Sequence, residues 1–519
     1  SWLWLPILAA LAVDWTACLS PEWFYDGQVY HLGLPERFLM VHKFPVLPEH
    51  MLTFLPLNAE MLYGAALAFG GEEAAKLINL AYAGLLALAV AGLARRLAPG
   101  TAWVGGLAAL LVVTMPLAPV ENEITFGDNV RALWETLALA CVLDGLAGSR
   151  RGWLRAGAFA GCAMGSKYLA VIGAGVLFCA AAPTAWRGPR RKRSFVPALA
   201  YFAVASAVVS PWLFRNWLAG GDPVYPFGLG LFPTIRYSPE EMGLWMADNR
   251  HYGVEGQTFA RWLTLPYRVV MDLKDGDFGT FTTGPLFAAF LPLLVFRRAW
   301  PAGALAALGL IAVEWTCWSV SSQLIRYLLP ALAALAALLA WGVAEMGRAS
   351  PRHARLLLAA ALAWSGCSLV ARVLHRYNLE DMYGVYSFAA GRFAPGDAAA
   401  GRGYGAAFRA LPPGAVLLVG EDRVLGIGRR WKATSIFNEP LVRVWARECP
   451  SAGRVAVKAR QAGVRVALVN GDGLNALRDR GFMAMSAREW GVLNGWWKSL
   501  GVAYRAPPWT AYVVPARVK

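Results

Sequence analysis

The feature that most constrains this chain is a succession of apolar segments, each close to the length that crosses a bilayer. A spanning helix needs about 20 mainly apolar residues, and a backbone surrounded by lipid must satisfy its own hydrogen bonds, which favours helices. Hydrophobic residues make up 57% of the 519 residues and charged residues only 16%. We therefore predict a polytopic α-helical membrane protein with about eleven transmembrane helices, at 1–17, 75–94, 101–119, 124–146, 152–166, 168–186, 195–217, 283–296, 301–320, 324–346 and 355–375.

Basic residues are distributed unevenly over the connections between these segments. The connections at 95–96, 150–155, 187–193, 297–298 and 348–355 hold 15 Lys and Arg and no acid. All five lie on one side if the spans alternate, and the positive-inside rule makes that side cytoplasmic. This distribution explains most of the net charge of +16, so we expect membrane lipids and no nucleic acid as partners.

The opposite, extracytoplasmic side receives the larger connections. These are the outer loops 18–74 and 218–282 of a transmembrane domain that we place at 1–375, followed by the segment 376–519. We interpret residues 1–17 as the outer part of a first span whose start is missing.

The segment 376–519 differs in character from the rest of the chain. The runs 415–419, 464–469 and 511–514 predict short buried strands, and 451–462 predicts a helix between two of them. Strands that alternate with helices indicate a small C-terminal α/β domain with a partly parallel sheet.

Four ionisable residues stand at the outer ends of the predicted spans, where charges are costly and call for a reason. Asp26 follows the first span and Asp128 begins the fourth. Lys167 lies in the turn between the fifth and sixth spans, and Arg326 lies at the start of the tenth. The topology therefore predicts two carboxylates and two cations at one face of the bundle.

Each of the four residues also has a structural explanation. Asp26 could cap a helix or be solvated, and Lys167 could extend its ammonium to the interface. Asp128 could pair with Arg131, and Arg326 with Glu314. Taken together, however, carboxylates beside cations at a lipid–water boundary suit a reaction on a lipid-phosphate substrate. A carboxylate can accept a proton from an acceptor, and cations can stabilise the charge on a departing phosphate.

A divalent metal is a further possibility in the first outer loop. Its candidate ligands match no recognised spacing, and they are His31, His42, His50, Glu22, Glu49 and Glu60.

Several motifs resemble those of a known family. The segment 25–35 contains an aspartate–tyrosine–histidine–proline run, 165–168 is a Gly-Ser-Lys-Tyr turn, 210–226 contains Pro-Trp, Arg-Asn and Asp-Pro-Val-Tyr-Pro, and Arg326-Tyr327 precedes Pro330. These motifs are similar to those of the GT-C class of membrane glycosyltransferases, which includes protein O-mannosyltransferases and bacterial aminoarabinose transferases. The resemblance is greater to uncharacterised bacterial members, and it extends over nearly the whole chain.

The resemblance implies an inverting transfer of a sugar from a polyprenyl-phosphate donor to an acceptor hydroxyl at the extracytoplasmic face of a bacterial plasma (inner) membrane. The acceptor would be a lipid, a glycan or a protein. By the same resemblance Asp26 is the catalytic base and Asp128 the second acidic residue. The substrate-binding residues would be Tyr30, His31, Lys167, Tyr168, Arg326 and Tyr327, of which Lys167 and Arg326 would hold the donor phosphate.

One departure leaves the acceptor open. Protein O-mannosyltransferases carry an Asp-Glu pair in the first loop, whereas Gly27 follows Asp26 here. Two other hypotheses also stay open: a non-catalytic GT-C-like accessory subunit of a membrane complex, and a lipid transporter or flippase. A transporter predicts interrupted helices at mid-membrane and inverted repeats, and the sequence contains neither pattern.

Overall fold

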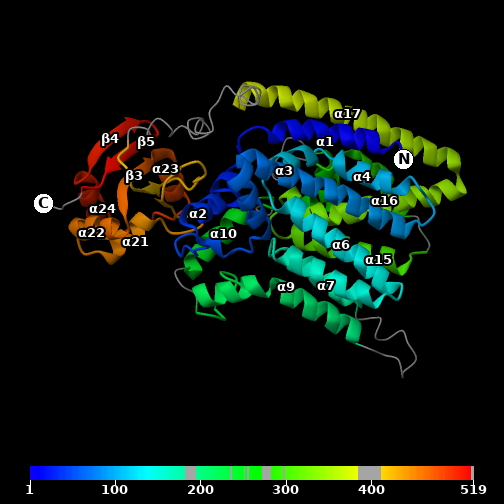
Figure 1. Ribbon diagram of the computed structural model, residues 1–519, viewed down its shortest axis with the longest axis horizontal. Helices are drawn as coiled ribbons and strands as arrows, with labels where there is room; N and C mark the ends of the chain where they lie inside the picture. Colours follow the sequence, from blue (N-terminus) through cyan, green and yellow to red (C-terminus); the bar gives the residue numbers. More distant parts are fainter. Residues whose placement is uncertain are drawn as a thin grey trace.

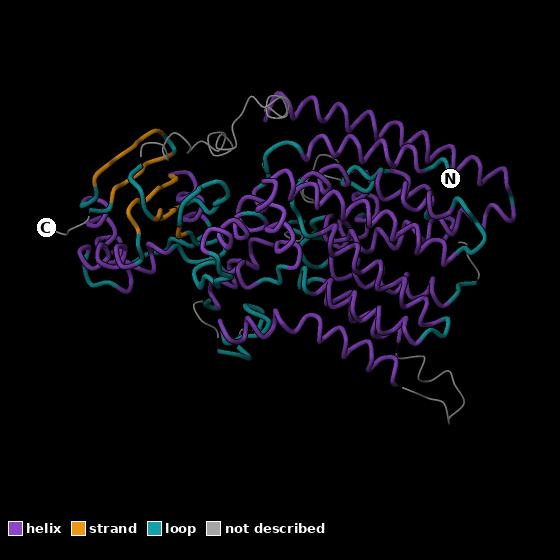
Figure 2. The backbone as a smooth tube through the Cα atoms, in the orientation of Figure 1, coloured by secondary structure: helices purple, strands orange, loops and turns teal. Residues whose placement is uncertain are grey.

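The computed structural model describes residues 1–181, 195–228, 230–233, 237–250, 252–253, 256–271, 282–295, 299–383 and 411–515. Two parts make up the molecule. Figure 1 shows long helices gathered in one bundle, with a small sheet beyond one end of it, and Figure 2 shows that the strands belong to this end alone. The helices of the bundle are α1 (Trp4–Cys18), α3 (Asn58–Leu97), α4 (Val104–Val113), α6 (Asp128–Leu146), α7 (Arg150–Met164), α8 (Ala170–Ala181), α9 (Val196–Gly220), α13 (Pro285–Phe290), α14 (Pro292–Val295), α15 (Ala302–Ser319), α16 (Leu329–Ala349) and α17 (Pro351–Tyr383).

The helices match the predicted membrane spans in position. Five of the described helices are long and apolar enough to cross a membrane, namely α3, α9, α15, α16 with the turn before it, and α17. Four shorter apolar segments accompany them: α1, α4, α8 and the pair α13–α14. Each predicted span contains helix, so the helical class is confirmed, whereas the number of about eleven crossings stays a prediction. The predicted span 283–296 is two short helices, because Pro292 begins a new helix after Leu291.

Burial separates the centre of the bundle from its lipid-facing rim. In the most apolar part of α16, 89% of the residues are buried, against 22% in α9 and in α17. Alanine supplies much of the surface of α16, which lets neighbouring helices approach closely. The outer helices keep large apolar side chains exposed, among them Leu199 and Phe202 on α9 and Leu374 on α17. This distribution is typical of a helical membrane protein.

The first outer loop, predicted over 18–74, is largely helical. It contains the π-helical turn η1 (Gly27–His31), α2 (Gly33–Val41), the 3-10 turn η2 (Met51–Phe54) and the first part of α3. Gly70 and Gly71 break α3, and the φ of +73° at Gly71 belongs to the region that favours glycine. The loop 218–282 contributes α10 (Pro239–Arg250), α11 (Phe259–Leu263) and α12 (Leu265–Met271). The basic connections 187–193 and 297–298, on which the predicted orientation partly rests, lie outside the described residues.

A buried ion pair joins the first and last helices of the bundle. Asp14 on α1 is fully buried, and its carboxylate accepts hydrogen bonds from Arg372 on α17 and from Asn122 at 2.7 Å. Arg372 also donates to the backbone oxygen of Val113. Because a buried charge is tolerated only when it is paired, Asp14 explains why α17 returns to lie along α1 (Figure 1).

The C-terminal sheet has five strands in the order β2-β1-β3-β5-β4. The strands β1 (Ala415–Val419), β2 (Trp431–Lys432) and β3 (Val464–Asn470) run parallel, and β5 (Trp509–Val513) pairs antiparallel with both β3 and β4 (Gly501–Ala506). The predicted strands 415–419, 464–469 and 511–514 correspond to β1, β3 and β5, and the predicted helix 451–462 is α22 (Ala452–Gln461). The prediction missed β2, which is only two residues long, and β4, whose residues are mostly exposed and show no alternation of apolar and polar side chains.

Candidate active site

Four ionisable side chains from four separate parts of the chain meet at the end of the bundle nearest the sheet. Lys167 Nζ lies 2.6 Å from Asp128 Oδ2, and Arg326 Nη2 lies 3.0 Å from Asp26 Oδ2. Arg326 Nε lies 3.8 Å from the same Asp128 oxygen, which links the two pairs. The structure therefore brings together all four residues that the sequence placed at one face.

Local structure fixes each of these residues. Asp26 precedes η1, and Asp128 is the first residue of α6. Lys167 lies between α7 and α8, and Arg326 lies in the 3-10 turn η6 (Ile325–Leu328) that leads into α16. All four charged residues therefore lie at or beside the ends of helices and turns. None of the four lies in the apolar middle of the bundle.

The cluster has both buried and accessible parts. Asp128 is fully buried, whereas Asp26 keeps 22% of its side chain exposed and Lys167 and Arg326 keep 15% and 16%. The Arg326 guanidinium lies over the ring of Phe126, 4.2 Å from its centroid. Among the described residues, Arg326 Nε and Asp128 Oδ1 have no hydrogen-bond partner. The cluster thus has donors and acceptors to spare for a ligand.

Two pairings that the sequence suggested do not form. Arg131 contacts Glu135 at 2.6 Å and Glu314 at 2.8 Å, rather than Asp128. Glu314 therefore forms its ion pair with Arg131, and Arg326 contacts Asp26 and Asp128 instead. Arg131 also donates to the backbone oxygen of Tyr327 at 3.0 Å, so this buried network supports the turn that carries Arg326.

The tyrosines predicted to bind substrate occupy different positions. Tyr327 lies beside the cluster, with Lys167 Nζ and the Arg326 guanidinium each 5.5 Å from its ring centroid. Tyr30 is half-buried and lies against the ring of His31, with centroids 3.9 Å apart. The hydroxyl of Tyr168 accepts a hydrogen bond from Asn216 on α9 at 2.8 Å, and the ring contacts Phe227. Tyr168 therefore points away from the charges despite following Lys167.

His31 lies at the inner edge of the cluster. Its Nδ1 is 2.6 Å from Glu60 Oε1, and both side chains are buried, with 1% and 2% of their surfaces exposed. Its ring also lies edge-on to Phe126, the residue that covers Arg326.

Solved structures share this arrangement of helices and sheet. ArnT from Cupriavidus metallidurans, bound to undecaprenyl phosphate, is similar with a TM-score of 0.57 and 16% identity, over 99% of this chain and 98% of that one. The oligosaccharyltransferase of Archaeoglobus fulgidus, in complex with Zn and sulfate, is similar with a TM-score of 0.54 and 15% identity, over 98% of this chain and 73% of that one. The chain has the GT-C fold. No family model and no curated protein matches its sequence.

The Glu22 side chain lies where a side chain after Asp26 would begin. A Cβ at Gly27 would lie 2.5 Å from the Cδ of Glu22, so the Glu22 carboxyl occupies the space of a side chain at this position. Glu22 in turn accepts hydrogen bonds from the backbone N–H and the hydroxyl of Thr125, at 2.9 and 2.7 Å. It thereby ties the loop that carries Asp26 to the segment that precedes Asp128.

The ligands suggested for a divalent metal do not gather. No group of three or more His, Cys, Asp or Glu side chains in the described parts of the chain could hold a metal ion. His31 Nδ1 contacts Glu60, and Glu49 forms an ion pair with Lys432 at 3.0 Å. His50 is buried beside Trp431, where burial lowers its pKa to about 4. We therefore derive no step through a metal at these residues.

Sequence reasoning missed a contact between the C-terminal domain and the loop that carries Asp26. The hydroxyl of Tyr25, the residue before Asp26, donates to Asp422 Oδ1 at 2.5 Å, and the N–H of Ile436 donates to Asp422 Oδ2 at 2.9 Å. Tyr25 and Asp422 line a cavity of about 290 Å³ at the carboxyl ends of β1 and β3. The position of Asp422 after a buried strand was the available signal, but no local pattern connects it with a residue 397 positions away.

Burial of Asp422 predicts a pH dependence of stability. Burial raises its pKa from 3.8 to about 7, so the folded state binds this proton more tightly than the unfolded chain. The free energy of unfolding should therefore fall as the pH rises from about 4 to about 7, by at most about 1.4 kcal/mol per pH unit, and should then level off. Thermal unfolding of wild-type protein and of Asp422→Asn across this range measures the difference.

The matched control is Asp472→Asn, which changes an exposed aspartate in the same domain. We expect this variant to retain the wild-type pH profile and Asp422→Asn to flatten it. Equal slopes in all three proteins would contradict the assignment.

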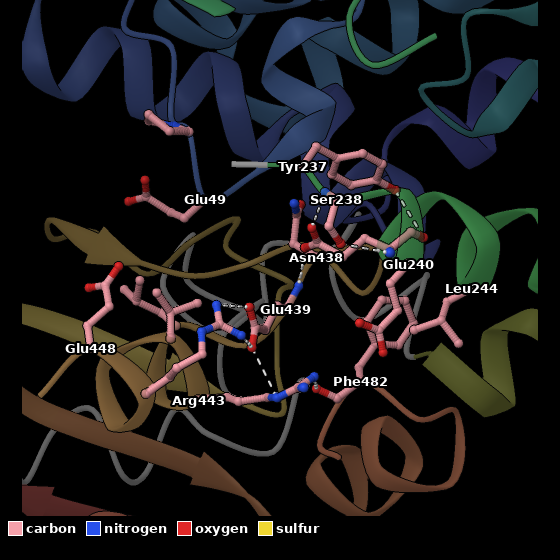
Figure 3. Close-up of a pocket in the computed structure, with 15 residues that line it drawn as sticks. Glu49, Tyr237, Ser238, Glu240, Leu244, Asn438, Glu439, Arg443, Glu448 and Phe482 are labelled. Atoms are coloured by element: carbon pink, nitrogen blue, oxygen red, sulfur yellow. Dashed lines mark hydrogen bonds and ion pairs between the residues drawn. The ribbon is translucent and has the colours of Figure 1, made fainter. Parts of the chain in front are cut away.

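A second cavity lies between α10 and α21 (Leu441–Glu448), with a volume of about 430 Å³. Figure 3 shows Glu439 at its centre, facing Arg443. Arg447 donates two hydrogen bonds of 2.6 Å to the Glu439 carboxylate, and the backbone N–H of Glu439 donates to Glu241. None of the eight predicted site residues lines this cavity, and its central charges are paired. We interpret this cavity as part of the interface between the C-terminal domain and the outer loops.

Proposed function

We propose that this chain is an integral-membrane glycosyltransferase that moves a sugar from a polyprenyl-phosphate donor to an acceptor hydroxyl. The observation that carries the proposal is the cluster formed by Asp26, Asp128, Lys167 and Arg326 at one end of an apolar helical bundle. The GT-C fold supports it, because ArnT with the same fold is bound to undecaprenyl phosphate. The acceptor, whether lipid, glycan or protein, is left open.

Asp26 acts as the general base in this mechanism. It is the more exposed of the two carboxylates and the one at the edge of the outer loop. Its carboxylate accepts the proton of the acceptor hydroxyl while the acceptor oxygen attacks the anomeric carbon from the side opposite the phosphate. The bond between that carbon and the phosphate oxygen breaks, and its electron pair leaves with the lipid phosphate. Attack from the opposite side inverts the anomeric configuration.

Lys167 and Arg326 stabilise the departing phosphate. Cations fixed before the reaction stabilise developing charge without reorganisation, and a planar guanidinium suits two phosphate oxygens at once. Asp128 lies between them and, being fully buried, holds both cations in position. Without donor, the aspartates balance the two positive charges. With donor bound, we propose that phosphate oxygens share these cations and that Arg326 releases Asp26 for proton transfer.

We propose that this site lies at the extracytoplasmic face of a bacterial inner membrane, which the uneven distribution of Lys and Arg supports. The C-terminal domain lies on the same side and reaches the catalytic loop through the Tyr25–Asp422 hydrogen bond. We propose that it docks the acceptor.

The test is turnover by the purified full-length chain in nanodiscs. Polyprenyl-phosphate sugars are supplied with lipid, glycan and peptide acceptors, and release of polyprenyl monophosphate is measured together with labelled sugar on the acceptor. We expect release that depends on one acceptor class. Transfer of labelled lipid between leaflets without release would support the transporter hypothesis, and turnover only after addition of a partner protein would support the accessory-subunit hypothesis. Either result would overturn the proposal as stated.

A further inference from the structure

We propose that His31, held in place by Glu60, is a third contact for the phosphate of the lipid-linked donor, beside Lys167. This inference rests on the proposed function and gives His31, which the resemblance counts among the substrate-binding residues, a contact with one defined group of the donor. The observation behind it is a buried nitrogen without a partner. His31 is 1% exposed, its Nδ1 lies 2.6 Å from Glu60 Oε1, and its Nε2 has no hydrogen-bond partner among the described residues.

Packing fixes the direction of the ring. Tyr30 lies against one face of His31, with centroids 3.9 Å apart, and Phe126 meets the ring edge-on at 6.1 Å. Glu60 belongs to the first turn of α3, so its carboxylate is attached to a rigid element. One hydrogen lies between Nδ1 and Glu60 Oε1 in this hydrogen bond, so Nδ1 is not available to a ligand. The contact with Glu60 therefore leaves Nε2 as the nitrogen that can face a ligand.

Gly127 leaves an open position between His31 and Lys167. A Cβ built at Gly127 would lie 3.3 Å from Lys167 Cε and 3.8 Å from His31 Cε1. The backbone of Gly127, with φ of −88° and ψ of 5°, is one that alanine also adopts, so glycine is not required by conformation. Its effect is to leave the space between the two side chains free of a methyl group, which would press against Lys167 Cε.

The side chains around Gly127 favour a negatively charged ligand. A buried nitrogen left without a partner costs free energy, and the neighbouring side chain is a cation. An oxygen that carries negative charge satisfies both, and the substrate class proposed above supplies one in its phosphate. With phosphate bound, Nε2 donates its hydrogen to a phosphate oxygen while Nδ1 keeps its hydrogen bond with Glu60. Glu60 touches no substrate and is a positioning residue.

Two substitutions of His31 separate this role from a structural one. Asparagine places an amide near Nδ1 and can retain the contact with Glu60, whereas glutamine places an amide donor near Nε2. The probe is a short-chain polyprenyl monophosphate, and its Kd is measured in detergent micelles. We expect His31→Asn to bind it about tenfold to a hundredfold more weakly, and His31→Gln to retain most of the affinity. Wild-type affinity in His31→Asn, or a greater loss in His31→Gln, would overturn the inference.

Gly127→Ala tests the same site without touching the histidine. The added methyl fills the opening, so we expect binding about tenfold weaker at an unchanged unfolding temperature. Gly243→Ala is the matched control, because a Cβ at this glycine of α10 meets no atom within 4 Å. His50→Gln is the control for loss of a buried histidine in the same outer loop. If the two His31 variants fail to fold, wild-type affinity in Gly127→Ala refutes the inference.

The experiment also separates this inference from the proposed function. Lys167→Met is measured in parallel. Loss of binding in Lys167→Met with wild-type binding in His31→Asn and Gly127→Ala rejects the role of His31 alone. No measurable binding of polyprenyl monophosphate by the wild-type chain, together with no turnover, rejects the proposed function as well.

Discussion

Asp26→Asn should abolish sugar transfer while leaving the binding of the lipid phosphate in place. Asparagine has the shape of aspartate and can still accept a hydrogen bond from Arg326, which lies 3.0 Å from the native carboxylate. It cannot accept the proton of an acceptor hydroxyl at neutral pH. General base catalysis contributes about 10²- to 10⁴-fold, so we expect kcat to fall by that factor. The Kd for a polyprenyl monophosphate should change less than threefold. Both kcat and this Kd are measured for the wild-type chain and the variant.

The control for this prediction is Asp144→Asn. Asp144 also forms an ion pair with an arginine, Arg96, at 2.9 Å and is 25% exposed, but it lies at the far end of α6 from Asp128. We expect it to keep wild-type turnover. Turnover by Asp26→Asn within threefold of wild type would remove Asp26 from the mechanism, and equal losses in both variants would indicate damage to the bundle instead.

The charged cluster could be predicted from the sequence because each member breaks a local rule. Lys167 is a cation on the side that the positive-inside rule leaves poor in Lys and Arg, and Asp128 is a carboxylate at the start of an apolar run. Such violations indicate which residues need a partner. They do not indicate which partner each one finds. Arg131 stands three residues after Asp128, yet it bonds Glu135 one turn on and Glu314 of another helix.

Features that depend on contacts between distant segments could not be predicted from the sequence. The Tyr25–Asp422 hydrogen bond depends on how the C-terminal sheet meets the bundle, and the position of Asp422 after a buried strand does not indicate Tyr25 as its partner. The opposite holds for β1, where Ala415–Val419 is a continuous apolar run that could be recognised directly. Strand β4 has no such run, because it lies at the edge of the sheet with most of its side chains exposed.

Lys167→Met should weaken both donor binding and turnover. The substitution keeps much of the length and apolar character of the side chain but removes the ammonium, which lies 2.6 Å from Asp128 Oδ2. Loss of one preorganised charge at a site of developing charge costs about 10²- to 10³-fold. We therefore expect kcat/KM to fall by that factor, with part of the loss appearing as a weaker Kd for polyprenyl monophosphate. This split distinguishes Lys167 from Asp26, for which the loss should lie in kcat alone.

Two further variants separate the phosphate contact from the ion pair. Lys167→Met leaves Asp128 fully buried and 3.8 Å from Arg326, which also destabilises the fold. Adding Asp128→Asn removes that unpaired charge, so Lys167→Met with Asp128→Asn should recover the unfolding temperature without recovering donor binding. Lys432→Met breaks the ion pair between Lys432 of the C-terminal domain and Glu49 of the first outer loop and should leave donor binding unchanged. Donor binding that returns with stability in the double variant would mean that Lys167 only neutralises Asp128 and does not contact the phosphate.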